Sequence, residues 1–346
     1  MELVSSSKPF TDIHLEEGEV PMLRGLYGWE EVQSMEPTSR EDMEPLLIAI
    51  DQNWQEEVKK RLLSKPFDLS TWRLRLKAFQ TGGGEKIAVA IRRQPATPLT
   101  MEQAGLPVSV KLMTSMSRGI ILVSGPTGAG KTTTLASMVD EINSTRQSHI
   151  ITIERPIEYI HRRKQGIVTL REVGVDVNTF LEGVEDAVQQ SPDIILIGEI
   201  RDAPTARAAL LAAESGHLVM ASIHANTAVS TVQKILGFFG EDEYRSRAEA
   251  LATTLVGVIC QIRLPRKDKT GFAIAPELLF NQQQQFSKYI DRPERLQMQY
   301  DKNEEPHSTS MKKVIAHLIQ QEIVDRTLGT QAVNSMGQVI RHSDLS

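Results

Sequence analysis

Three features of this sequence predict an α/β protein with a small α+β domain followed by a larger domain built on a parallel sheet. The chain has 346 residues, more than a single hydrophobic core usually organises. Strand-like and helical patterns mix before residue 94, whereas apolar runs alternate with helix-like runs after residue 100. Two prolines lie between these regions. We therefore expect two domains joined by a linker.

The first domain, expected over residues 1–93, has strand-like segments around a helical one, at 12–15, 41–63 and 72–79. In the last of these, Arg73 and Arg75 fall on one face and leucines on the other. The glycine-rich turn Thr81–Gly84 leads to a second apolar run, Lys86–Ile91, which we expect to be its hairpin partner. This pattern is typical of a small α+β domain.

We place the linker at residues 94–100, because the prolines there disfavour regular structure. The second domain, residues 101–281, contains short runs that are apolar on both faces, which predicts buried parallel strands joined by crossover helices. These runs are Gly119–Ser124, His149–Ile153, Asp193–Ile197 and Leu218–Ile223. From residue 282 to 346 a four-glutamine tract opens a polar region that we expect to be helical, with a disordered end at 341–346.

Composition excludes several classes of protein. The net charge is −5, and eleven of the acidic residues fall within the first fifty positions, which does not give the basic surface of a nucleic-acid-binding protein. No apolar run approaches the length of a membrane span, and the N-terminus lacks the pattern of a signal peptide, so we expect a soluble cytosolic protein. The single cysteine, Cys260, can form no internal disulfide, and its apolar surroundings predict burial.

A phosphate-binding loop follows the first of the apolar runs. The pattern G-x-x-x-x-G-K-[ST] needs Gly125 and Gly130 so that backbone N–H groups can wrap phosphate oxygens, and the helix expected from Thr133 to about Asn143 directs its positive end at the same anion. Lys131 would reach the β and γ phosphates, and the Thr132 hydroxyl would bind Mg²⁺. The alternative is a chance match in a glycine-containing turn. The loop residues are Gly125, Pro126, Thr127, Gly128, Ala129, Gly130, Lys131, Thr132 and Thr133.

An acidic residue ends another buried strand, in the segment Ser191–Asp202. This is the form of a Walker B segment, whose carboxylate, here Glu199, holds Mg²⁺ through water or polarises the attacking water. The alternative is a strand followed by a charged turn. The phosphate loop some seventy residues earlier favours the catalytic interpretation.

Two more polar segments follow buried strands. Glu154 and Glu158 come just after Ile151–Ile153, and because parallel strand ends share one rim, either could approach the nucleotide. The spacing alone does not choose between them, and both could be surface charges. His217 and His224 flank the last strand, so they lie at opposite ends and cannot share a metal; either could serve capping or packing instead.

These four segments, in this order, resemble the secretion and pilus motor ATPases, and most of all the PilT-like twitching ATPases and their relatives in type IVb and conjugation-type secretion systems. That family carries a Walker A loop, an Asp box I-T-I-E-D-P-I-E, a Walker B segment D-I-I-L-V-G-E-x-R-D and a His box G-H-L-V-x-x-x-x-H. The likeness covers roughly residues 11–280. It implies a PAS-like N-terminal domain joined to a RecA-like ATPase domain, with ATP bound between them and Mg²⁺ as cofactor.

The resemblance also implies roles for single residues. Glu199 takes the catalytic Walker B position, and the second Asp-box glutamate, the other catalytic carboxylate of the family, corresponds to Glu158. His217 and His224 match the His box and would contact the nucleotide. Arginines that reach the nucleotide from the N-terminal domain or a neighbouring subunit resemble Arg73, Arg75 and Arg92, although all three could equally be exposed sheet arginines.

The sequence departs from the family in three places. Arg155 replaces the aspartate that names the Asp box, so any role of that aspartate is lost or rewired. The retraction-motor helix A-I-R-N-L-I-R has no clear copy after Asn281, which leaves retraction open. The four-cysteine metal site of many pilus-assembly and type II secretion members is absent, which argues against that branch.

We therefore expect a homo-hexameric ATPase that powers a type IV pilus or a related secretion or conjugation system. Its partner would be an inner-membrane platform protein, reached from the cytoplasmic face of the bacterial membrane, with no direct contact to nucleic acid. A pilus retraction ATPase is the narrower alternative. A nucleic-acid translocase and a non-hydrolysing assembly scaffold are alternatives of another class, and a small-molecule kinase is the weakest.

Overall fold

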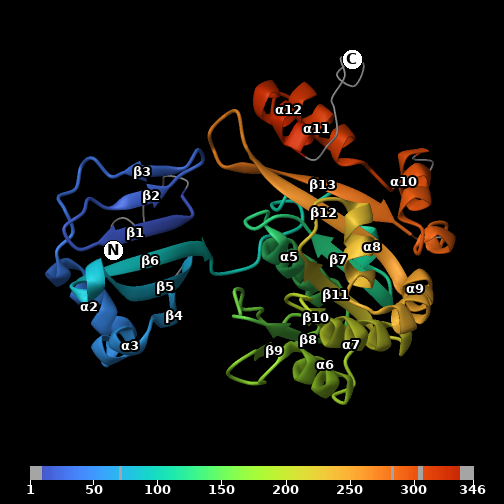
Figure 1. Ribbon diagram of the computed structural model, residues 1–346, viewed down its shortest axis with the longest axis horizontal. Coiled ribbons are helices and arrows are strands. Elements are labelled where there is room, and N and C mark those ends of the chain that lie inside the picture. The colour runs from blue at the N-terminus through green and yellow to red at the C-terminus, as the bar shows by residue number, and fades with distance from the viewer. Residues whose placement is uncertain (1–9, 70–71, 282–283, 303–306, 336–346) are drawn as a thin grey trace. The chain divides into compact units, whose positions relative to one another are not determined.

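The computed structural model describes residues 10–69, 72–281, 284–302 and 307–335 (Figure 1). The chain divides into two compact units, one of Met1–Thr97 with Lys269–Gly271 and one of Pro98–Asp268 with Phe272–Ser346. The end of the tail, expected to be disordered at 341–346, lies outside the described residues.

The first unit contains an antiparallel sheet with strand order β3-β2-β1-β6-β5-β4. Its apolar core includes Ile13, Met43, Leu47 and Trp54, which are almost fully buried. The elements are β1 (Asp12–Glu16), β2 (Met22–Arg24), β3 (Trp29–Glu31), α2 (Arg40–Ile50), α3 (Trp54–Lys60), β4 (Leu63–Asp68), β5 (Trp72–Thr81) and β6 (Lys86–Pro95). The predicted hairpin of β5 and β6 is confirmed, and the small α+β domain is present.

Two expectations for this unit were wrong in detail. The helix expected over 41–63 is broken into α2 and α3, because the Asp51 side chain accepts a hydrogen bond from the Asn53 backbone and so competes with the helical ladder. The segment that follows is not helical but forms β4. The strand β6 continues through Pro95 into the expected linker; Pro95 is its last residue, opposite Trp72, where a missing N–H disrupts little of the ladder.

The second unit contains a seven-stranded sheet with order β13-β12-β7-β11-β10-β8-β9, in which only β13 runs antiparallel to its neighbour. The four predicted strands correspond to β7 (Gly119–Ser124), β8 (His149–Glu154), β10 (Ile194–Ile197) and β11 (Leu218–Ile223), so the parallel sheet is confirmed. Three strands were not predicted: β9 (Ile167–Glu172), β12 (Leu255–Pro265) and β13 (Phe272–Phe280).

Helices cover both faces of this sheet (Figure 1), which explains why β7, β10 and β11 are buried at every position. In β7, Ile120 and Leu122 pack into one core cluster and Ile121 and Val123 into the other. The cluster on the first face also contains buried residues of α6 (Phe180–Val188), α7 (Ala203–Glu214), α8 (Ala228–Leu236) and α9 (Glu241–Thr254). The cluster on the second face contains buried residues of α4 (Val108–Thr114) and α5 (Lys131–Thr145).

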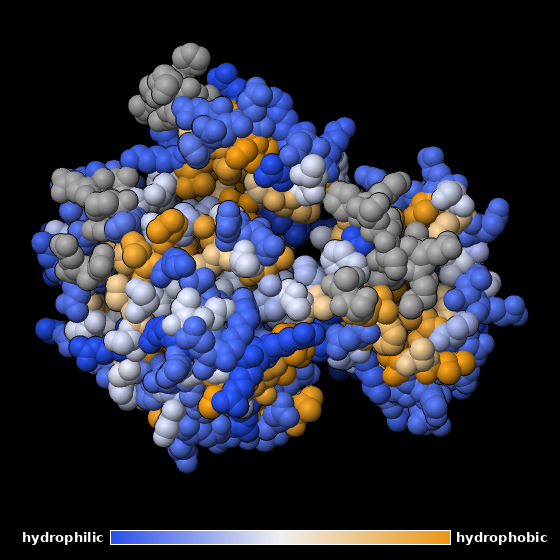
Figure 2. Space-filling view, turned by 180° about the vertical axis from the view of Figure 1, so that it is seen from behind, coloured by the Kyte–Doolittle hydropathy of each residue, from blue (hydrophilic) through white to orange (hydrophobic). Residues whose placement is uncertain are grey.

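The region after β13 is helical, as expected, over the residues that the structure describes there. It contains α10 (Pro293–Lys302), α11 (Met311–Gln320) and α12 (Arg326–Ser335). Met311 and Ile315 of α11 pack with Ala275 of β13 in a separate small core. None of the helices in the described part of the chain has both the length and the apolar character needed to span a bilayer. Figure 2 shows groups of hydrophobic residues among hydrophilic ones on the visible surface of both units.

Candidate nucleotide-binding site

The carboxyl ends of four parallel strands bring the predicted segments to one edge of the sheet. Ser124 of β7 pairs with Ile223 of β11, and Ile197 of β10 pairs with Ala221 of β11 and Ile153 of β8. The loops after these residues therefore leave from the same rim, where open parallel sheets bind their ligands. The phosphate loop, the Walker B segment, the Asp box and the end of the His box all begin here.

The loop after β7 has the backbone of an anion cradle. Gly125, Gly128 and Gly130 have φ values of 141°, 81° and 90°, a region that side-chain-bearing residues avoid. Gly130 is the N-cap of α5, so the loop runs directly into a helix N-terminus. The N–H groups of the first helical turn have no acceptor within the helix, and together with the dipole they favour a bound phosphate.

The Lys131 ammonium is held at the base of this loop. Its Nζ donates hydrogen bonds to the backbone oxygens of Gly125 at 2.8 Å and Pro126 at 3.1 Å. Burial lowers the pKa of Lys131, while the nearby charge of Glu199 acts in the opposite direction. A partly desolvated cation beside a helix N-terminus is a strong attractor for phosphate oxygens.

Glu199, His224 and Arg201 form a chain of contacts that ends near Lys131. The Glu199 carboxylate accepts from His224 Nε2 at 3.0 Å and pairs with Arg201 at 2.5 Å. His224 Nδ1 lies 3.5 Å from Lys131 Nζ. Because the Lys131 ammonium can only donate, Nδ1 of His224 accepts and Nε2 donates to the Glu199 carboxylate. The Walker B carboxylate and the phosphate loop are thus linked through the second His-box histidine.

The two Asp-box glutamates have different environments. Glu154 ends β8 and is buried, and burial, with Glu158 and Glu172 nearby, raises its pKa to about 7. Glu158 is half-buried in the loop that follows. The adjacent Tyr159 is buried, and its hydroxyl lies 3.0 Å from Thr133 Oγ1 in the first turn of α5. This contact fixes the Asp-box loop to the phosphate-loop helix and keeps Glu158 near it.

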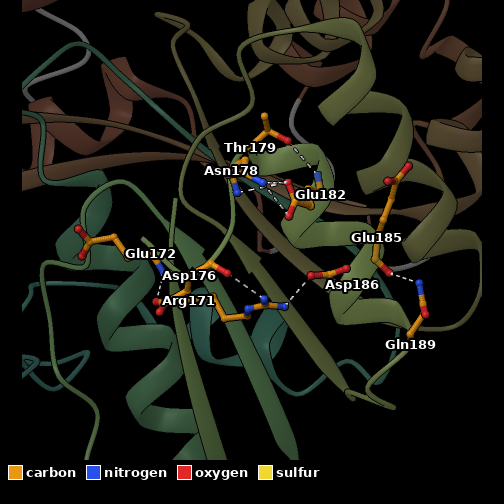
Figure 3. A network of polar contacts seen from close by, with 9 residues as sticks. All are labelled: Arg171, Glu172, Asp176, Asn178, Thr179, Glu182, Glu185, Asp186 and Gln189. Atoms are coloured by element: carbon orange, nitrogen blue, oxygen red, sulfur yellow. Dashed lines mark hydrogen bonds and ion pairs between the residues drawn. The ribbon is translucent and has the colours of Figure 1, made fainter. Parts of the chain in front are cut away.

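Polar contacts outside the rim hold β9 and its neighbours in place. Figure 3 shows Arg171 of β9 between the Asp186 carboxylate of α6, at 3.0 Å, and the backbone oxygen of Asp176, at 3.2 Å. Glu172, the last residue of β9, accepts from the Ile157 backbone at 3.1 Å. Through this hydrogen bond the edge strand β9 holds the Asp-box loop in place.

Four residues predicted to contact the nucleotide do not lie at this rim of the sheet. His217 precedes β11, at the end of the strand away from the loop, and its Nδ1 lies 2.9 Å from the Ala212 oxygen. Arg73 and Arg75 lie on β5 and Arg92 on β6 of the first unit. Arg73 is buried and pairs with Asp68 at 2.9 Å, and the exposed Arg92 pairs with Asp12 at 2.8 Å. Each of these two arginines therefore has an ion-pair partner inside its own unit.

Thr132 fits the role of a magnesium ligand in chemical type and place. It is half-buried in the first turn of α5, one residue after Lys131, and hydroxyl and carboxylate oxygens are the donors that Mg²⁺ prefers. Gly128 meets no other atom within 4 Å of where its Cβ would stand, so the loop leaves open space on that side. Thr132 and, through water, Glu199 would hold the ion that accompanies the phosphates.

One polar residue of the site, Gln261, was not singled out from the sequence. It lies on β12 with no exposed surface and contacts the phosphate loop. The available signal was a glutamine inside the otherwise apolar run Leu255–Ile262, where a buried amide requires partners.

Comparison with known proteins agrees with this geometry. Residues 66–326 match the family described as type II/IV secretion system protein. The chain is 36% identical to the type IV pilus retraction ATPase PilT of Pseudomonas aeruginosa over 278 residues, 80% of each chain. It is 34% identical to a twitching motility protein of Neisseria gonorrhoeae over 75% of this chain and 69% of that one.

Two solved structures have a similar fold. A crystal structure of the pilus retraction motor PilT with bound ADP matches with a TM-score of 0.80 at 33% identity and 93% coverage of both chains. The Legionella pneumophila ATPase DotB matches with a TM-score of 0.83 at 21% identity, over 96% of this chain and 93% of that chain. The second likeness concerns the fold alone.

Proposed function

The chain belongs to the type II/IV secretion system protein family and is a P-loop ATPase, and from this we propose that it works as a hexameric motor for a type IV pilus or a related secretion or conjugation system. The observation that carries the proposal is the contact chain from Lys131 through His224 to Glu199 at the rim of the parallel sheet. It joins a phosphate-binding group to a carboxylate able to act on water.

The residues of the site have different roles in ATP hydrolysis under this proposal. The loop N–H groups and Lys131 position and neutralise the phosphates, and Mg²⁺ supplies further charge neutralisation when bound. Glu199 orients the attacking water and accepts its proton, with Glu158 as the second carboxylate. When Lys131 moves from the loop carbonyls to a γ phosphate, His224 loses its contact with the ammonium, and its hydrogen bond to Glu199 changes. Arg73, Arg75 and Arg92 are the further candidates for nucleotide contact, whereas His217 lies at the end of β11 away from the phosphate loop.

Motor action requires an assembled ring. We propose a homo-hexamer that acts at the inner face of the bacterial cytoplasmic membrane on an integral platform protein, without binding nucleic acid. Likeness to retraction ATPases favours a retracting motor within this class. The experiment is deletion of the gene followed by a count of surface pili: excess pili support retraction, and absence of pili supports assembly. Unchanged pili with blocked export or conjugation would place the motor in a secretion system.

The assembly itself is tested separately. Sedimentation of the purified protein with Mg²⁺ and ATP should give the mass of six chains. ATPase activity stimulated by DNA with a steep salt dependence would instead favour the nucleic-acid translocase. Binding of ATP without turnover would favour the scaffold.

A further inference from the structure

Gln261 is a buried amide in the strand that lies next to the phosphate loop. It belongs to β12, where its neighbours Cys260 and Ile262 are also buried. A primary amide without exposed surface needs hydrogen-bond partners, because an unpaired buried amide costs roughly 1–3 kcal/mol. Both partners of Gln261 belong to the nucleotide site.

The amide spans the end of the loop and the first turn of α5. Its Nε2 donates to the Ala129 oxygen at 2.7 Å, and its Oε1 accepts from Thr134 Oγ1 at 2.8 Å. The orientation of the amide is fixed by chemistry, because a backbone carbonyl can only accept. Ala129 and Thr134 stand on either side of the four residues whose N–H and side-chain groups would meet the phosphates and Mg²⁺.

The backbone of β12 lies equally close to the loop. Cys260 pairs with Ser124 in the parallel ladder, so Gln261, the next residue of β12, lies at the level of Gly125. A Cβ added to Gly125 would lie 2.2 Å from the backbone oxygen of Gln261. A Cβ added to Gly130 would lie 3.3 Å from the side-chain Nε2 of Gln261. The loop therefore rests against Gln261 at its first and last glycines.

One of these bonds sets the direction of a phosphate-facing group. The Ala129 carbonyl and the Gly130 N–H belong to one planar trans peptide and point in opposite directions. Because Gln261 holds the carbonyl toward β12, the N–H is directed away from β12. We propose that Gln261 is a positioning residue that holds the phosphate loop and the first turn of α5 in their nucleotide-binding conformation. The inference depends on the loop binding nucleotide phosphates, as proposed above, but not on the kind of machine that the motor drives.

The test compares ADP affinity with stability. Gln261→Met keeps the length of the side chain and removes both bonds, and Thr134→Val removes only the second bond. Asn281→Leu is the matched control. Asn281 is also a buried amide, but it bonds the backbones of Leu255 and Phe286, at the start of β12 and beyond the end of β13, away from the phosphate loop. Binding of ADP with and without Mg²⁺ is measured by titration calorimetry, and the nucleotide-free melting temperature by scanning calorimetry. Tryptophan fluorescence is unsuitable, because all three tryptophans are in the first unit.

We expect Gln261→Met to weaken ADP binding about tenfold and Thr134→Val about threefold, in keeping with the loss of one or two hydrogen bonds. The double variant should bind like Gln261→Met, because the two changes remove a shared bond. Asn281→Leu should lower the melting temperature and leave ADP affinity unchanged.

Wild-type ADP affinity in Gln261→Met would overturn the inference. If that variant does not fold, unchanged affinity in Thr134→Val would overturn it. An equal loss of affinity in Asn281→Leu would also overturn it, because the effect would then be general destabilisation. If the unsubstituted protein binds no ADP at all, the proposed function fails and this inference with it.

Discussion

His224 Nε2 lies 3.0 Å from the Glu199 carboxylate, while the other nitrogen of the same ring faces the Lys131 ammonium at 3.5 Å. One imidazole thus contacts both the phosphate-binding group and the Walker B carboxylate. Removal of Lys131 from the loop by a phosphate would change the field at His224 and, through it, the hydrogen bond to Glu199.

Lys131→Ala should weaken nucleotide binding without unfolding the protein. The ammonium is partly desolvated and donates to the carbonyls of the buried Gly125 and the exposed Pro126, so its loss costs the fold little. Charge-assisted bonds to phosphate contribute about 1.5–3 kcal/mol, which predicts a loss of ADP affinity of roughly tenfold to a hundredfold. Titration calorimetry measures the affinity, and scanning calorimetry measures the stability. A large fall in melting temperature would show that Lys131 is mainly structural.

His224→Ala should lower kcat more than it lowers ADP affinity. The ring contacts the catalytic carboxylate and orients it, so its loss affects the chemical step, and we expect a decrease in kcat of about tenfold to a hundredfold. His149→Gln is the control, because His149 lies at the start of β8, where it bonds Thr169. Phosphate release at saturating ATP is the measurement. Equal kcat values for His224→Ala and the wild type would exclude a role for this histidine in turnover.

Glu277→Gln should flatten the dependence of stability on pH. Burial raises the pKa of this β13 carboxyl to about 7, above the value of about 4.5 expected when unfolded. Between these values the folded state binds more protons, so stability falls as pH rises through the window from about 4.5 to 7. Because one pKa unit is worth about 1.4 kcal/mol, the group costs on the order of 3 kcal/mol above pH 7.

The glutamine variant can still accept the hydrogen bond from the Ala228 backbone, which Glu277 accepts at 2.8 Å. It should therefore be more stable than the wild type at pH 8, and the difference should disappear below pH 4.5. Melting temperatures from pH 4 to pH 8 measure this. Parallel curves for the two proteins would show that Glu277 does not titrate in this range. Glu154, whose pKa is raised to about 7 for the same reason, is unchanged in both proteins and cancels in the comparison.

The sequence predicted the parts of the fold whose signal is local. The strands β7, β8, β10 and β11 are apolar at successive positions because helices cover both faces, and that pattern is visible without a structure. The strand β9 was missed because none of its six residues is fully buried, so it lacks the continuous apolar pattern of the other parallel strands. The break between α2 and α3 depends on one side-chain hydrogen bond at Asp51, which propensity does not reveal.

In the candidate site too, the residues with a local sequence signal were predicted, and those that depend on distant pairing were not. Motif spacing found Lys131, Glu199 and His224 because each follows a strand end on one rim, and the structure brings these three together. Gln261 was missed because its role depends on the parallel pairing of β12 with β7, which joins residues more than 130 positions apart. The different environments of Glu154 and Glu158 depend on packing against β9, which spacing does not encode.

The most direct test of the ATPase account compares phosphate release by the purified protein and by Glu199→Gln, both saturated with Mg²⁺ and ATP. Glutamine has the shape of glutamate but cannot accept the proton of the attacking water, and loss of a general base reduces turnover by about a hundredfold or more. We predict that the wild type hydrolyses ATP, whereas the variant binds ATP with similar affinity and releases almost no phosphate. Hydrolysis by Glu199→Gln at the wild-type rate would contradict the account.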